Sequence, residues 1–211
     1  SDTPTARNFP GIPDPAVEQT DPSADLSGFS MMSRTPWQIT YEEDIYVGYR
    51  YYNTFGVPVA YEFGYGLSYT TFEISDLRPN ITEFTGEMTV TASVRNSGNT
   101  AGREVVQLYL SAPSGKMEKP EAVLVAFAKS KLLEPGESET LTFRLTTRDL
   151  ASFDEERSMW VAEAGTYTLR AGNSSRNLPL STTFTVTGEL DGGKVNKALA
   201  PQSPINRLSR K

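Results

Sequence analysis

Hydrophobic and polar residues alternate with a period of two in several short segments between residues 70 and 188. The segments MTVTASV (88–94), TLTFRL (140–145) and TYTLRAG (166–172) show the clearest alternation. Side chains of a β-strand point alternately to opposite faces of a sheet, so the pattern predicts strands with one buried face. The residues predicted to be buried are Phe72, Ile74, Met88, Val90, Ala92, Val94, Leu141, Phe143, Leu145, Tyr167 and Leu169.

Further short segments rich in β-branched and aromatic residues lie between the alternating ones. They are EVVQLYL (104–110), AVLVAFAKSKL (122–132), SMWVAEAG (158–165) and TTFTVTG (182–188), with turn-forming residues in NSGN (96–99) and EPGES (134–138). About seven or eight strands with turns between them, and no long segment of helical period, are typical of an antiparallel β-sandwich. We therefore predict an all-β, immunoglobulin or fibronectin type III-like sandwich over residues 67–188. The absence of Cys favours the fibronectin type III kind, which needs no disulfide.

The chain before and after the predicted sandwich has a different composition. Residues 1–40 combine many Pro residues with scattered large apolar ones, such as Phe9, Phe29 and Trp37. This favours an extended arm that lies on another surface, and a disordered linker is the alternative. Residues 189–211 are expected to leave the sandwich as a tail or linker with a solvated basic end, in which KVNKALA (194–200) forms a short helix.

Aromatic side chains are crowded into one stretch of the chain. Ten of the 20 Tyr and Phe residues lie between Tyr46 and Phe72. If IYVGYRYY (45–52) is a strand, it carries bulky side chains on both faces, as a strand covered on both sides does. Buried Tyr hydroxyls need partners, and Arg50 is expected to supply charge and stacking. We interpret the stretch as a buried seam between domains; a sugar-stacking surface or another binding platform is the alternative.

The composition excludes several kinds of chemistry. The net charge of −6 argues against binding to nucleic acids or to anionic membranes, and no apolar run reaches the length of a membrane span. The chain has no Cys and no His, which excludes metal sites built on these residues, disulfides and His-based catalytic groups. We expect no cofactor, because GYG (64–66) and GGK (192–194) lack the spacing of a phosphate loop.

Acidic residues are dense in only two places, YEEDIY (41–46) and FDEER (153–157). Glycoside hydrolysis needs two carboxylates about 5–9.5 Å apart, one on each side of the reacting bond. Adjacent strand residues point in opposite directions, so neither group supplies this geometry by itself. Both groups are therefore expected to be solvated loops or strand ends.

Two long stretches resemble glycoside hydrolase family 3. The stretch EEDIYVGYRYYNTFGVPVAYEFGYGLSYTTFEISDL (42–77) is similar to the segment that joins the α/β-sandwich domain of these enzymes to a fibronectin type III-like domain. Residues 96–175 are similar to that domain over nearly its whole length. The resemblance implies that residues 1–66 comprise an arm and the terminal strand of an α/β-sandwich domain, followed by the fibronectin-like sandwich.

The resemblance also implies a function. Members of glycoside hydrolase family 3 include retaining β-glucosidases and β-xylosidases, which act on oligosaccharides or aryl β-glycosides. Their nucleophile lies on a (β/α)8 barrel and their acid/base residue usually on the α/β-sandwich. Neither motif matches a position here, so this chain alone is expected to be inactive and to support the catalytic domains.

The partners implied are the barrel and the α/β-sandwich domain of the same enzyme, in the same chain or in a second one. A circularly permuted domain order and a nicked enzyme remain open, as does a cytoplasmic, periplasmic or secreted location. An independent carbohydrate-binding or adhesion module is the alternative function. The residues expected at the interdomain seam, or at the rim of the active site, are Trp37, Tyr46, Tyr49, Arg50, Tyr52, Phe55, Phe63 and Tyr65.

Overall fold

The computed structural model describes residues 12–13, 37–198, 200–201 and 203–210. They belong to two compact units. The first contains the described residues up to Asp44 and those from Pro201 to Ser209, and the second contains those from Ile45 to Ala200 with Arg210. The expected docked arm falls mostly on residues outside the described ranges.

The first unit contains a short antiparallel ladder, in which β1 (Ile12–Pro13) pairs with β2 (Trp37–Gln38). The basic end of the chain also contacts an acidic stretch in this unit. The Leu208 N–H donates to the Glu42 carbonyl oxygen at 2.6 Å, and the Arg207 guanidinium lies 3.5 Å from the Asp44 carboxylate. Arg207, Ser209 and Arg210 are exposed, as predicted for a solvated basic end, although these two contacts hold the segment to residues 42–44.

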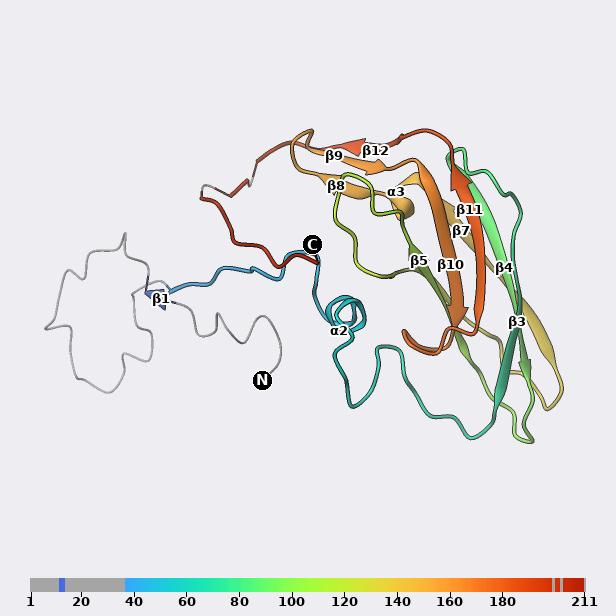
Figure 1. The fold of residues 1–211 in the computed structure, drawn as a ribbon. Coiled ribbons are helices and arrows are strands. Elements are labelled where there is room, and N and C mark those ends of the chain that lie inside the picture. The colour runs from blue at the N-terminus through green and yellow to red at the C-terminus, as the bar shows by residue number, and fades with distance from the viewer. Residues whose placement is uncertain (1–11, 14–36, 199, 202, 211) are drawn as a thin grey trace, which may run out of the picture. The chain divides into compact units, whose positions relative to one another are not determined.

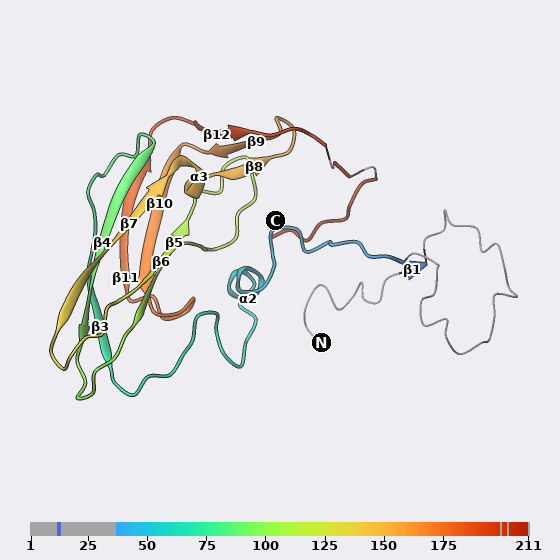
Figure 2. The same ribbon diagram turned by 180° about the vertical axis from the view of Figure 1, so that it is seen from behind.

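The second unit is a β-sandwich (Figure 1). One sheet has the order β11–β10–β5–β6, formed by Leu180–Val186, Gly165–Gly172, Val105–Ser111 and Val123–Lys129. The other has the order β3–β4–β7, formed by Phe72–Pro79, Glu87–Asn96 and Ser138–Thr146. All neighbouring strands of these sheets run antiparallel, and Figure 2 shows the two layers from behind. The all-β prediction is confirmed.

The core lies between the two sheets, on the faces that the alternation predicts. The four apolar residues of MTVTASV are at most 1% exposed, and those of TLTFRL at most 7%. Phe72 and Ile74 are half-buried and pack against this cluster. Burial of an aliphatic side chain of this size contributes roughly 1.5–3 kcal/mol, so these faces decide the register of the strands.

Polar groups inside the sandwich have partners. The buried Asn96 side chain donates to the carbonyl oxygens of Thr100 and Leu133, both at 2.8 Å, and accepts from the Gly98 N–H at 3.1 Å. It thus fixes the connection predicted from NSGN. The Tyr167 ring stacks on Phe184 at 5.4 Å, and its hydroxyl donates to the Glu163 carbonyl oxygen.

The region after the sandwich differs from the prediction. β12 (Leu190–Lys194) pairs with β9 (Met159–Ala162), which pairs with β8 (Ser152–Asp154), so residues 190–194 do not leave the fold as a tail. The predicted helix is also absent, since residues 194–198 and Ala200 contain no helical turn. Pairing with β9 holds this glycine-containing segment extended, and the ladder shifts register between Asp191 and Gly193.

Two short helices complete the second unit. α3 (Thr147–Leu150) follows β7 and starts with a capping box between Thr146 and Asp149. α2 (Tyr49–Thr54) occupies the stretch IYVGYRYY, where we predict a two-faced strand, so that prediction is wrong. The Tyr52 N–H donates to the carbonyl oxygen of Gly48, which has a positive φ of 60°. A helix also places bulky residues on several faces, which is why alternation alone misleads here.

Candidate interdomain docking site

The linking segment, residues 45–66, contacts the sandwich through two connections between strands. The first is the β5–β6 connection, residues 112–122. The Tyr46 hydroxyl donates to Glu118 Oε1 at 2.6 Å, and the Glu121 N–H donates to Thr54 Oγ1 at 2.9 Å. These bonds attach both ends of α2 to one connection.

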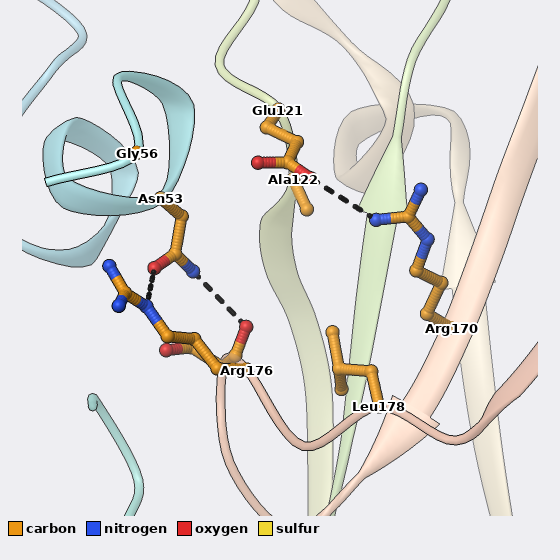
Figure 3. A pocket seen from close by; sticks show the side chains of 8 residues that line it. Asn53, Gly56, Glu121, Ala122, Arg170, Arg176 and Leu178 are labelled. Carbon is orange, nitrogen blue, oxygen red and sulfur yellow. Dashed lines mark hydrogen bonds and ion pairs between the residues drawn. The ribbon is translucent and has the colours of Figure 1, made fainter. Parts of the chain in front are cut away.

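The second contact is the β10–β11 connection, residues 173–179. Arg176 Nε donates to Asn53 Oδ1 at 2.9 Å, and the Asn53 amide donates to the Ser175 carbonyl oxygen at 3.1 Å, as Figure 3 shows. The second guanidinium nitrogen of Arg176 donates to the carbonyl oxygens of Val57, at 2.7 Å, and Tyr52, at 3.2 Å. A planar guanidinium with several fixed donors suits this role, because it closes the C-terminal end of α2.

The end of the linking segment is held by the same connection. The Ser174 hydroxyl donates to Glu62 Oε1 at 2.9 Å, and the Ser175 N–H donates to the Phe63 carbonyl oxygen at 2.8 Å. Gly64 has a φ of 84°, and a Cβ there would lie 2.3 Å from the side chain of Gln107. The absence of a Cβ at Gly64 permits this close approach, and its positive φ also favours glycine.

Aromatic rings join the linking segment to the sandwich. The Tyr49 ring stacks on Phe63 at 4.8 Å and meets Tyr109 of β5 edge-on at 5.8 Å. The Tyr49 hydroxyl accepts from the Leu124 N–H at 2.8 Å. Burial, with the nearby Tyr49 as a second cause, raises the pKa of Tyr109 above its ordinary value. The inner side of this contact is therefore dry and structural.

Apolar side chains also point to solvent from the outer side. Five residues spaced by two form what we name the exposed row: Tyr61, Phe63, Tyr65, Leu67 and Tyr69. Leu67 is 90% exposed and Tyr69 98%. Large apolar side chains exposed at several nearby positions of one segment are candidates for contact with another surface or a ligand.

The structure brings together some of the predicted site residues. Tyr46 is 1% exposed and packs edge-on against Phe55 at 4.9 Å; Tyr49 and Phe63 stack; and Tyr52 contributes its carbonyl oxygen. Tyr65 packs against Tyr61 at 5.3 Å and belongs to the exposed row.

Arg50 and Trp37 take part in none of the contacts described for this group. Within the described ranges, no hydrogen bond or ion pair of Arg50 is found, and the hydroxyls of Tyr46 and Tyr49 bond to Glu118 and Leu124. The expectation that Arg50 partners these Tyr hydroxyls is therefore wrong for those bonds. Trp37 lies in β2 of the first unit, and its side chain is outside the description.

Several residues of the docking site have no signal in the sequence. Glu118 and Arg176 are polar residues of loops, and Asn53 directly follows the segment interpreted as a strand, so none of them forms a motif. Asn53 and Arg176 are 123 positions apart, so only the folded sandwich reveals the pair. Recognition of α2 as a helix would place Tyr49 and Asn53 four residues apart on the same side.

The described residues show no metal-type cluster. They contain no group of three acidic side chains arranged to hold a metal ion. Asp154 ends β8, while Glu155 and Glu156 are exposed, as predicted for a strand end. Among the described helices, none has the length and apolar character needed to cross a membrane.

An antiparallel two-sheet sandwich with these connections defines a fibronectin type III-like domain. A family model for the fibronectin type III-like domain matches residues 104–175. The solved β-glucosidase 3B of Thermotoga neapolitana, in complex with α-D-glucose, is 47% identical with a TM-score of 0.73, over 89% of this chain and 23% of that one. The GH3 β-glucosidase of Bifidobacterium adolescentis is 31% identical with a TM-score of 0.73, over 96% and 26% of the two chains.

A curated β-glucosidase of Ruminococcus albus is 44% identical over 176 residues, which are 81% of this chain and 18% of the relative. The chain thus spans less than a quarter of the length of this relative. It belongs to glycoside hydrolase family 3, and corresponds to the part of a β-glucosidase that carries the fibronectin type III-like domain.

Proposed function

We propose that this chain is the non-catalytic, supporting part of a retaining β-glucosidase-like enzyme that hydrolyses terminal β-D-glucosyl or related bonds. The linking segment fixes the sandwich to the catalytic barrel and α/β-sandwich domain. The observation that carries the proposal is the combination of a firmly held linking segment and a run of exposed apolar side chains. The segment is bonded to two connections of the sandwich, and the exposed row, which continues past the segment to Tyr69, is accessible to solvent.

We assign two different roles to the residues expected at the interdomain seam. Tyr46, Tyr49 and Phe55 hold the linking segment on the sandwich, whereas the exposed row is covered by the other domains. Exposed area of this kind stabilises an interdomain contact by roughly 25 cal/mol per Å² of apolar surface removed from water. The relatives' own lengths support a larger protein around this chain, because the matched part is only 18–23% of the first two.

The catalytic residues lie outside this chain in the proposal. An assay of the purified chain with an aryl β-glucoside is therefore expected to show no hydrolysis. Turnover that disappears on substitution of one of the chain's own carboxylates would overturn this part of the proposal.

The supporting role is tested in the whole enzyme that carries this chain. Tyr69→Ser is expected to lower the melting temperature of the whole enzyme and leave that of the isolated chain unchanged. Phe127→Ser is the matched control, because Phe127 is also exposed, at 68%, but lies on β6 outside the exposed row. Equal effects of the two substitutions in the whole enzyme would argue against a covered exposed row.

A carbohydrate-binding module is the second candidate. One hollow in the linking segment favours it, because rings and polar groups line it together: Tyr49, Tyr52, Asn53, Val59, Tyr61, Glu62 and Phe63. Rings beside amide and carboxyl groups are a common arrangement for binding sugars. Tyr61→Ala removes the most exposed ring, so titration calorimetry with cello-oligosaccharides before and after this change separates the two functions.

A further inference from the structure

A second hollow lies between α2 and the sandwich, away from the exposed row. It has a volume of about 370 Å³ and is lined by Asn53, Gly56, Glu121, Ala122, Arg170, Ser175, Arg176 and Leu178. Figure 3 shows that these residues come from three places: α2 and the turn after it, the start of β6, and β10 with its connection to β11. We name it the Arg170 hollow.

Some hydrogen-bond donors and acceptors in the Arg170 hollow are not used within the protein. Arg170 and Glu121 form a loose ion pair at 3.5 Å, with side chains 37% and 44% exposed. A guanidinium has five N–H donors and a carboxylate several acceptor positions, so this pair leaves most of them unused.

The other wall is already fixed. Asn53 and Arg176 bond to each other and to backbone carbonyl oxygens, so the α2 side keeps its shape without a ligand. Ala122 and Leu178 supply aliphatic surface between the two polar sides (Figure 3). A preformed hollow with an apolar part and a few polar groups is the usual form of a small-molecule site.

The charges decide between classes of ligand. An anion would accept from Arg170 but would also lie beside the Glu121 carboxylate, which repels it. A neutral sugar avoids this repulsion, because each hydroxyl both donates and accepts and can bond to Glu121 and Arg170 together. The C–H face of a sugar ring also packs on aliphatic side chains such as Ala122 and Leu178.

From this combination we infer that the Arg170 hollow is an accessory binding site for a neutral saccharide of one or two sugar units. The site contains no residue of the exposed row, shares only Asn53 with the hollow at Tyr61, and is independent of the proposed supporting function. Its occupancy is a property of the isolated chain, whereas the supporting function is measured as stability of the whole enzyme.

The test is a titration of the purified chain with cellobiose, followed by NMR or calorimetry. Saturable binding is expected, and Arg170→Gln and Glu121→Gln are each expected to weaken it about tenfold or more, since each removes a charge-assisted hydrogen bond. Arg78→Gln is the matched control. It removes one positive charge, as Arg170→Gln does, but from an exposed ion pair with Asp76 on β3. This control and Tyr61→Ala are expected to bind cellobiose as the unchanged chain does.

Three results overturn the inference. One is the absence of saturable binding of cellobiose by the folded chain. Another is binding that Tyr61→Ala abolishes and Arg170→Gln leaves intact, which moves the sugar to the linking segment. The third is tighter binding of inorganic phosphate than of cellobiose, strengthened by Glu121→Gln, which identifies an anion site. Circular dichroism of each variant confirms that the fold is retained.

Discussion

Lys119 and Glu163 form a buried ion pair, with Lys119 Nζ 2.8 Å from Glu163 Oε2 and side chains only 4% and 9% exposed. The Lys116 N–H donates to the other carboxylate oxygen at 2.7 Å. Glu163 follows β9, and both Lys residues belong to the β5–β6 connection. The pair therefore fixes the connection that carries Glu118 and Glu121, two of the residues that bond to the linking segment.

Acid is expected to loosen this connection. Burial of Glu163 opposes its ionisation, but the hydrogen bonds from Lys119 and Lys116 outweigh burial and lower its pKa below the ordinary value of 4.5. A group with a lowered folded pKa contributes stability that is complete above its unfolded value and is lost as the pH falls through the folded one. Urea unfolding is thus expected to show falling stability below about pH 4.5, with a smaller pH dependence for Glu163→Gln. An equal pH dependence in the unchanged chain and in Glu163→Gln would mean that other carboxylates cause the loss of stability in acid.

Removal of one member of the pair is expected to cost more than replacement of both. Lys119→Met leaves a buried carboxylate without its cation, and roughly 3–5 kcal/mol of the free energy of unfolding is expected to be lost at pH 7. The double variant Lys119→Met/Glu163→Leu removes both charges and is expected to recover part of this loss. Lys131→Met is the control, because Lys131 pairs with Glu137 in an exposed position, and a much smaller loss of stability is expected there. A double variant as unstable as the single one would contradict this account.

The pair of Asn53 and Arg176 is expected to be coupled in stability. Their direct bond and their shared contacts at the C-terminal end of α2 mean that either Asn53→Ala or Arg176→Ala disrupts the same contact. A double-mutant cycle by urea unfolding is expected to give an interaction free energy of about 0.5–3 kcal/mol. Arg176→Ala paired with Thr91→Ala on β4 serves as the distant reference, for which additivity is expected. Additive effects for Asn53 and Arg176 would show that α2 docks without this contact.

Substitution of Gly64 by Ala is expected to destabilise the protein more than substitution of Gly56. Both have positive φ, at 84° and 65°, so Ala costs backbone strain of roughly 1 kcal/mol at either position. At Gly64 the added Cβ also lies 2.3 Å from the Gln107 side chain, whereas at Gly56 it meets nothing within 4 Å. Thermal unfolding is therefore expected to show a larger loss for Gly64→Ala. A loss no larger than that of Gly56→Ala would mean that Gln107 moves aside freely.

A period of two predicts the strands with one buried face, such as β4 and β7, whereas β5 is buried on both faces and is indicated by its β-branched and aromatic residues. The face of β4 that carries Val90 and the face of β7 that carries Phe143 are set by burial alone, which alternation reports directly. Helix α2 and strand β12 are short, and their states depend on tertiary partners: Arg176 closes α2, and β9 pairs with β12. Local sequence cannot report contacts that span more than a hundred positions.

The docking of α2 also sets an order of events during synthesis. The linking segment leaves the ribosome early, but two of its partners, Glu118 and Arg176, are made about 70 and 120 residues later. Closing such distant contacts requires the strands between them to be in place, which is slow relative to local folding. We therefore expect that the linking segment is made before the sandwich but is attached to it last, and that its apolar rings stay accessible to chaperones until β10 and β11 are complete.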